Sequence, residues 1–251
     1  MIRVTVWHEE TEKGKEALFT DLPCYTPERQ AKIDGLYPEG MGRTIAAFLE
    51  EEGVETRVSY LTDEEQGLSE AILEKTDVLV WWGHRRHQVV EDALVRRVCD
   101  RVLGGMGMIF LHSAHESKPF QTILGTSGAL SWREDDDRQD IWAIEPNHPI
   151  AKGVPHIVLE HEETYAEPFL IPAPDELVYI SSYEGGEVFR SGCCWKRGLG
   201  RLFYFSPGHE TWPNLHHPDV QQVIRNAVHW AAPASAVKAR PKSVHIQKRE
   251  M

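Results

Sequence analysis

A histidine closely follows each of five apolar runs in this 251-residue chain, at His8, His84, His112, His161 and His209. Ligands of open parallel sheets bind at the carboxyl ends of the strands, so the residues just after each run are candidates for a site. Imidazole binds divalent metals and also transfers protons near neutral pH. The pattern therefore predicts a histidine-rich site at one edge of a sheet.

Two chemistries fit such a cluster. In the first, several imidazoles and a carboxylate bind a divalent metal, with zinc as the best match and manganese, iron or nickel as alternatives. In the second, the cluster holds no metal and binds a polyol, with His and Glu side chains as hydrogen-bond partners and proton carriers. No H-E-x-x-H motif or cysteine frame selects between the two.

The segment His112-Ser113-Ala114-His115 also allows a nucleophile. Ser113 could attack a substrate with His115 or His209 as its base, although a serine at the start of a helix is more often an N-cap. The sequence has no G-x-S-x-G or G-x-C-x-G elbow. Cys99 lies on the apolar face of a predicted helix and Cys193-Cys194 in a predicted hairpin strand, so a cysteine hydrolase is disfavoured.

The first half of the chain predicts the elements that would position these residues. Apolar runs typical of buried parallel strands are 2–7, 55–61, 77–82 and 107–111. Helical spacing occupies 40–53 and 89–105, each ending at glycine. Strands that are nearly all apolar, with helices between them, predict a parallel sheet covered on both faces.

The second half predicts an antiparallel extension of that sheet. Its strand candidates are 139–145, 156–160, 177–183, 187–197 and 201–206, followed by a closing helix over 219–231. The acidic run 134–137 is most simply a solvated loop, though it could cover the site. The region from His8 to Pro38 has little periodicity and is predicted to be a long excursion with a short helix near residues 27–30. Excursions of this length in compact domains are usually functional.

Length and composition set further limits. The chain fits one domain over residues 1–232, followed by a basic tail over 233–251. A net charge of −12 disfavours binding to nucleic acid or to an anionic membrane. No membrane-length apolar run or secretion signal is found and the four cysteines form no disulfide framework, so we expect a cytoplasmic location.

Taken together, several segments resemble the ThuA-like (trehalose utilisation) family, which has the class I glutamine amidotransferase-like fold. The resemblance covers roughly residues 2–232 and rests on the segments WHE, DVLVWWGH, GGMGMIFLHSAH, NHPIAKGVP, HEETY and GLGRLFYFSPGHE. It implies an α/β, flavodoxin-like three-layer sandwich in which His112-Ser113 stand where an amidotransferase keeps its cysteine.

The resemblance also implies a function: a metal-assisted enzyme that converts oxidised (3-keto) glycosides, such as a derivative of trehalose. The ion would polarise ketone and hydroxyl oxygens, a base would remove the C2 proton, and the group at C1 would leave. The implied metal ligands are His8, His112, His161 and His209. Candidate catalytic residues are His115, Glu163 and, for a metal-free hydrolase, Ser113. Candidate sugar-binding residues are Trp82, His84, Tyr165, Glu210 and Trp212. A non-catalytic sugar-binding or regulatory protein is the other alternative, and we expect a homo-oligomer.

Overall fold

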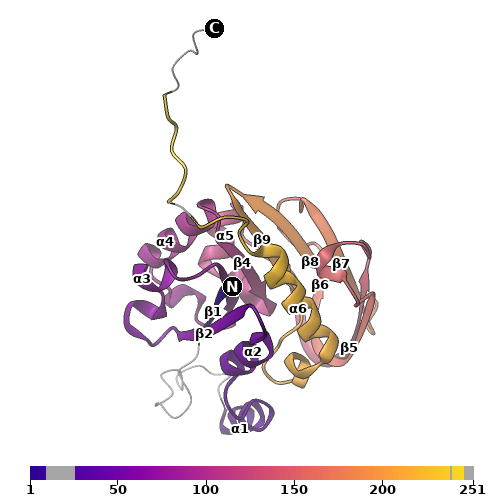
Figure 1. Ribbon diagram of the computed structural model, residues 1–251. Helices are drawn as coiled ribbons and strands as arrows, with labels where there is room; N and C mark the ends of the chain where they lie inside the picture. Colours follow the sequence, from indigo (N-terminus) through magenta and orange to yellow (C-terminus); the bar gives the residue numbers. More distant parts are fainter. Residues whose placement is uncertain (10–25, 238, 246–251) are drawn as a thin grey trace.

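The protein is built on one mixed sheet. The computed structural model describes residues 1–9, 26–237 and 239–245. Within these residues nine strands follow the order β2-β1-β3-β4-β9-β8-β7-β5-β6 (Figure 1). The parallel strands are β2 (Val54–Tyr60), β1 (Ile2–His8), β3 (Val78–Trp82), β4 (Gly107–Leu111) and β9 (Gly200–Phe205). The antiparallel extension consists of β8 (Val188–Arg197), β7 (Glu176–Tyr183), β5 (Ser131–Ala143) and β6 (His156–Ala166).

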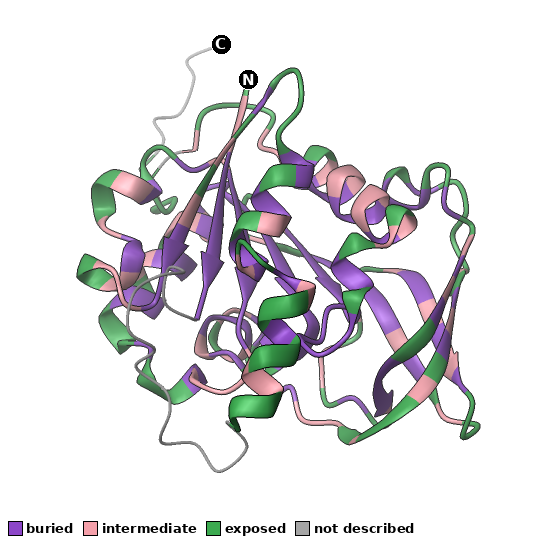
Figure 2. Cartoon of the chain, turned by 90° about the horizontal axis from the view of Figure 1, so that it is seen from below, coloured by how far each residue is buried: buried purple, intermediate pink, exposed green. Residues whose placement is uncertain are grey.

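Helices cover both faces of the parallel half. They are α1 (Pro27–Leu36), α2 (Met41–Leu49), α3 (Glu70–Leu73), α4 (Asp92–Leu103), α5 (Lys118–Leu124) and α6 (Pro218–Ala231). The apolar residues of α2 and α6 form one core with alternate strand residues such as Val80 and Ile109, whereas α3, α4 and α5 pack on the opposite side with Leu79 and Phe110. Figure 2 shows the resulting buried strands between helices with exposed outer faces. The period-two alternation of side chains along each strand produces these two cores.

Local sequence explains where the helices near the site begin and end. Ser117 caps α5 by accepting a hydrogen bond from the Phe120 amide, and Gly125 ends that helix in the left-handed conformation. Pro218 occupies the first turn of α6, where its missing amide hydrogen costs no helical hydrogen bond. Short 3-10 turns complete the connections: Glu64–Gly67, His87–Val89, His112–Glu116, Pro149–Ala151 and Pro213–His216.

The predicted architecture, a parallel sheet between helices with an antiparallel extension, is confirmed. Two strands extend well beyond their predicted bounds. β5 begins at Ser131, so the acidic run 134–137 lies in a strand, where Arg133 contacts Asp137 and Glu187 and offsets their charge. β6 continues to Ala166, so Glu163 lies inside a strand and does not follow one.

Beyond His8, the described parts of the predicted excursion and of the tail contribute one helix, α1, and no strand. Of the predicted excursion from His8 to Pro38, residues 10–25, including Cys24, lie outside the described residues. After α6, Val237 packs against the core on the α4 side, and Arg240 lies 3.2 Å from a carboxylate oxygen of Asp100.

Candidate functional site

His112 lies at the sharp turn that follows β4. Its φ of 53° is in the left-handed region, which a non-glycine residue adopts at a cost of roughly 1–3 kcal/mol. Nδ1 of the buried ring lies 3.1 Å from the backbone oxygen of Ser206, just past the end of β9. A hydrogen on Nδ1 that donates to this oxygen leaves Nε2 facing Glu163, whose Oε2 is 3.2 Å away.

His84 follows β3 and is held by a carboxylate. Its Nδ1 lies 2.8 Å from Oε2 of Glu210, so an Nδ1 hydrogen donates to the carboxylate and the Nε2 lone pair stays available. The loop that carries His84 is itself clamped, because the buried carboxylate of Glu9 accepts the amide hydrogens of Arg85 and Arg86 at 2.7 and 3.0 Å.

His209 follows β9 in a loop that a second buried glutamate holds. Oε2 of Glu162 accepts the Gly208 amide hydrogen at 2.9 Å and a side-chain hydrogen of Asn214 at 3.0 Å. Nδ1 of His209 lies 2.9 Å from the hydroxyl of Thr211. The Thr211 amide also donates to Nδ1 at 3.2 Å, and a guanidinium nitrogen of Arg29 lies 3.3 Å from Nε2, the nitrogen on the other side of the ring.

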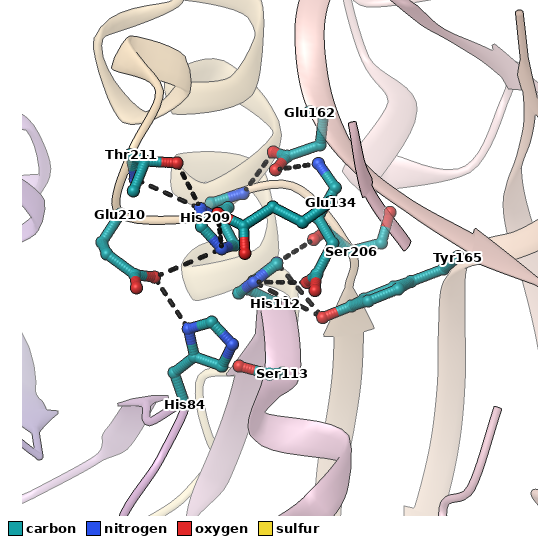
Figure 3. Close-up of polar contacts among 12 residues, drawn as sticks. His84, His112, Ser113, Glu134, Glu162, Tyr165, Ser206, His209, Glu210 and Thr211 are labelled. Atoms are coloured by element: carbon teal, nitrogen blue, oxygen red, sulfur yellow. Dashed lines mark hydrogen bonds and ion pairs between the residues drawn. The ribbon is translucent and has the colours of Figure 1, made fainter. Parts of the chain in front are cut away.

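These residues come together at the carboxyl edge of the sheet (Figure 3). One potential ligand atom from each of His84, His112, Glu163 and His209 lies within 4.8 Å of all the others. The centroids of the three imidazole rings are 5.0 to 5.2 Å apart, so the rings form a nearly equilateral triangle. Three nitrogens and one carboxylate oxygen are a donor set that suits zinc and related divalent ions.

Burial and charge keep His209 and Glu163 in the form that binds a cation, whereas His112 tends to hold a proton. Burial lowers the pKa of His209 well below its usual value, so its imidazole is neutral. For His112, burial also opposes the charge, but contact with Glu163 outweighs it and raises the pKa. Burial works against ionised Glu163, yet contact with His112 lowers its pKa to about 2.

Glu210, whose carboxylate contacts Nδ1 of His84, is ionised. Burial disfavours its ionisation, but the electrostatic interaction and hydrogen bond with His84, together with the charge of Arg85, hold its pKa well below the usual value. Its Oε1 also accepts hydrogens from Arg29 and Arg85 at 3.0 and 2.8 Å. Glu210 is therefore an ionised carboxylate that links three positively charged or chargeable side chains.

A cavity of about 270 Å³ lies directly beside the group. Its walls combine residues of the group with acids, bases and aromatic rings: Arg29, His84, Arg85, Ser113, His115, Glu116, Trp132, Glu134, Glu163 and Tyr165. This volume is near the lower end of the range that small-molecule sites occupy, about 300–1,000 Å³. The cavity has room for a ligand of about one sugar ring next to the imidazoles.

Comparison with known proteins identifies the family. Residues 28–231 match ThuA, the trehalose utilisation family. The chain belongs to this family. No curated protein sequence matches it. The predicted resemblance to ThuA-like proteins is thus confirmed.

Solved structures share the fold of this ThuA-family chain. A ThuA-like protein from Bacteroides uniformis has a TM-score of 0.61 at 16% identity, over 91% of this chain and 90% of that one. A cytoplasmic protein from Salmonella typhimurium has a TM-score of 0.59 at 12% identity, over 93% and 100%. A GMP synthase protein from Thermoplasma acidophilum has a TM-score of 0.50 at 14% identity, over 91% and 93%. At these identities the likeness concerns the fold. Within the described residues, no helix has the length and apolar character needed to cross a bilayer.

Two of the histidines predicted as metal ligands do not join the group. The ring of His8 is buried and stacks on Trp82, with centroids 4.3 Å apart and planes at 3°. His161 is exposed on the edge strand β6, and its Nδ1 lies 3.0 Å from the backbone oxygen of Asp136. Beside His112 and His209, the group instead contains His84, which was predicted to bind sugar, and Glu163, which was predicted as a base.

Of the three aromatic residues predicted to contact sugar, one lines the cavity beside the group and two do not. Trp82 is buried in the core, with its indole nitrogen donating to the Gly208 oxygen at 2.9 Å, so it does not line the cavity. Trp212 packs on His209 and lines a second cavity of about 410 Å³ on the other side of Arg29 and Glu134. Tyr165 lines the cavity beside the group, and its hydroxyl is 3.4 Å from Nε2 of His112.

Ser113 and His115 both line the cavity, but each is bonded elsewhere. The Ser113 hydroxyl donates to the Gly83 oxygen at 3.0 Å. Nδ1 of His115 lies 2.7 Å from the Gly128 oxygen, and burial lowers the pKa of His115 to about 4. Neither contact pairs the serine with an imidazole, whereas a Ser-His nucleophile would require that pairing.

Sequence reasoning missed three residues at the site. Arg29, on α1, donates to Glu134 at 2.9 Å and to Glu210 at 3.0 Å. Glu134 lines both cavities, and Trp132 lines the one beside the imidazoles. None of them follows a parallel strand, so the strand-end pattern does not predict them. The acidic run 134–137, a possible cover for the site, is the one hint to Glu134.

Proposed function

We propose that this ThuA-family chain is an enzyme of carbohydrate metabolism that cleaves an oxidised (3-keto) glycoside with the help of a divalent ion, zinc being the best match. The observation that carries the proposal is the group His84, His112, Glu163 and His209, whose ligand atoms lie within 4.8 Å of one another beside a cavity of about 270 Å³. Membership of the trehalose utilisation family supports a sugar as substrate.

The chemistry of the donor set fits an ion. Oε2 of Glu163 is buried and accepts no hydrogen bond among the described residues, although it faces Nε2 of His112. The lone pairs of two acceptors at this distance repel each other unless a proton or a cation lies between them. Glu210 and the Ser206 oxygen would hold the outer nitrogens of His84 and His112, as partners of metal-bound imidazoles do.

A bound ion would act as a Lewis acid and polarise the ketone and hydroxyl oxygens of the sugar. The residues around it would handle the protons. His115 is neutral at pH 7, since its pKa is about 4, and its Nδ1 bond to Gly128 leaves Nε2 as a basic nitrogen. It suits the role of base better than Glu163, whose pKa is about 2 and which belongs to the ligand group.

In the proposed reaction, His115 takes the C2 proton, which the neighbouring C3 ketone makes acidic. The C2–H electron pair becomes the C1–C2 double bond as the C1–oxygen bond breaks, and the leaving oxygen takes a proton from solvent water. Tyr165 has a pKa well above 10, mainly because it is buried, so its phenol stays protonated and can donate a hydrogen bond to a sugar oxygen.

Metal analysis of tag-free protein by plasma mass spectrometry tests the proposal. We expect about one divalent ion per chain in the wild type, loss of that ion in the His112→Ala, His209→Ala double variant, and retention in His161→Ala. His161 is a matched control because it is exposed and lies outside the group. Release of the leaving group from a 3-keto-glucoside should stop on chelation and return with zinc. An ion-free wild type, or turnover that chelation leaves unchanged, would exclude metal assistance.

A further inference from the structure

Trp132 is largely exposed to solvent, which is uncommon for so large an apolar side chain. Its exposed fraction is 64%, whereas Trp7, Trp81, Trp82 and Trp195 are buried. Transferring an indole from solvent to an apolar contact is favourable, so a tryptophan left at the surface beside a cavity marks a place where a ligand can cover it. Trp132 lines the cavity that also contains His84 and Glu163.

The strand register places Trp132 next to Tyr165. The two residues are directly paired between antiparallel β5 and β6, so their side chains share one face of the ribbon. Tyr165 is buried against His112, and Trp132 is exposed. The cavity therefore has one aromatic ring at its inner end, beside the imidazoles, and a second at its solvent side.

The backbone that carries Trp132 is anchored. The next residue, Arg133, donates to both carboxylate oxygens of Glu187, at 3.2 and 2.8 Å, and also contacts Asp137. These contacts tie the start of β5 to the turn between β7 and β8. An indole on a fixed backbone binds a flat ligand face with little loss of conformational freedom.

We propose that Trp132 forms the wall of a leaving-group subsite, against which the ring attached to C1 of the glycoside stacks. The inference rests on the proposed function, which places the oxidised sugar at the imidazoles. A cavity of about 270 Å³ is filled by roughly one ring, so a second ring must extend toward solvent, where Trp132 lies. The substrate class is then a glycoside with a ring-shaped leaving group, either a second sugar or an aromatic aglycone.

Trp142 provides a matched control on the same strand. It is also exposed, at 47%, but it stacks on His156 with centroids 3.8 Å apart and does not line the cavity. Removing either indole takes a similar apolar surface from β5. An effect confined to Trp132 would therefore reflect its place beside the cavity.

Steady-state kinetics on two 3-keto-glucosides, one with a 4-nitrophenyl and one with a methyl leaving group, tests the subsite. We expect Trp132→Ala to lower kcat/KM about tenfold for the aryl substrate and less than twofold for the methyl substrate, a difference that stacking commonly supplies. Trp132→Phe should keep most of the aryl preference, and Trp142→Ala should match the wild type. Equal losses on both substrates, or none on the aryl substrate, would overturn the subsite.

Binding separates this inference from the proposed function. If the wild type turns over neither substrate, titration calorimetry with the unoxidised 4-nitrophenyl and methyl glucosides still judges Trp132. A preference of the wild type for the aryl ligand that Trp132→Ala removes would support the subsite. Equal affinities, no binding, or a preference that survives Trp132→Ala would overturn it. Metal content, measured in the same samples, reports on the proposed function independently.

Discussion

Nδ1 of His84 and Oε2 of Glu210 lie 2.8 Å apart, with the carboxylate buried. This contact orients the imidazole and, if an ion binds, makes its other nitrogen a better ligand. We expect Glu210→Gln to weaken zinc affinity about 10- to 100-fold, because a neutral amide withdraws that support. Competition with a chelating dye measures the effect.

The exposed pair His229 and Glu51, at 2.7 Å, offers a control for Glu210→Gln. Glu51→Gln removes the charge of a glutamate that also contacts an imidazole. Neither Glu51 nor His229 belongs to the ligand group, so zinc affinity should not change. Equal zinc affinities in wild type and Glu210→Gln would contradict the assigned role of Glu210.

Zinc affinity should rise with pH. Contact with Glu163 outweighs burial and raises the pKa of His112 above its usual value of 6.5, so the metal-free protein holds a proton on His112 to a higher pH than an ordinary imidazole does. That proton stabilises the fold fully below pH 6.5 and ceases to do so as the pH rises through the raised pKa. Zinc must displace the same proton, so affinity increases over this interval. Titrations at pH 6, 7 and 8 check the trend, and a pH-independent affinity would contradict it.

Ser113→Ala should keep its activity. The hydroxyl donates to the Gly83 oxygen, so its loss should cost stability of about 0.5–1.5 kcal/mol and change turnover by less than about tenfold. A Ser-His hydrolase would instead lose about 10⁴-fold or more and would be insensitive to chelation. Assays of the variant with and without a chelator separate the two mechanisms.

Gly107, the first residue of β4, lies directly against Ala231, the last residue of α6. A Cβ atom at this position would lie 2.5 Å from the backbone oxygen of Ala231, so Gly107→Ala should destabilise the fold by about 1–3 kcal/mol through overpacking. In contrast, a Cβ on Gly35 of α1 would contact nothing within 4 Å, and Gly35→Ala should stabilise by about 0.5–1 kcal/mol. Urea denaturation of both variants checks the opposite signs.

The order of the elements and the candidate strand ends follow from local features of the sequence. Apolar runs of four to six residues, each followed by a polar residue, are a local property that predicted His84, His112 and His209 at the ends of strands. The glycines and prolines that end or begin helices are equally local. These signals were sufficient for the order of the parallel strands and for the place of three imidazoles of the group at strand ends.

Tertiary structure alone decided which of these residues meet. His161 also follows an apolar run, but β6 continues beyond it and runs along the outer edge of the antiparallel extension, so the ring is exposed. Alternation along the same strand places Glu163 against His112 and its neighbour Glu162 against Gly208. Arg29 reaches Glu210 across 181 residues of sequence. Contacts of this kind depend on how layers pack, and no local pattern encodes that packing.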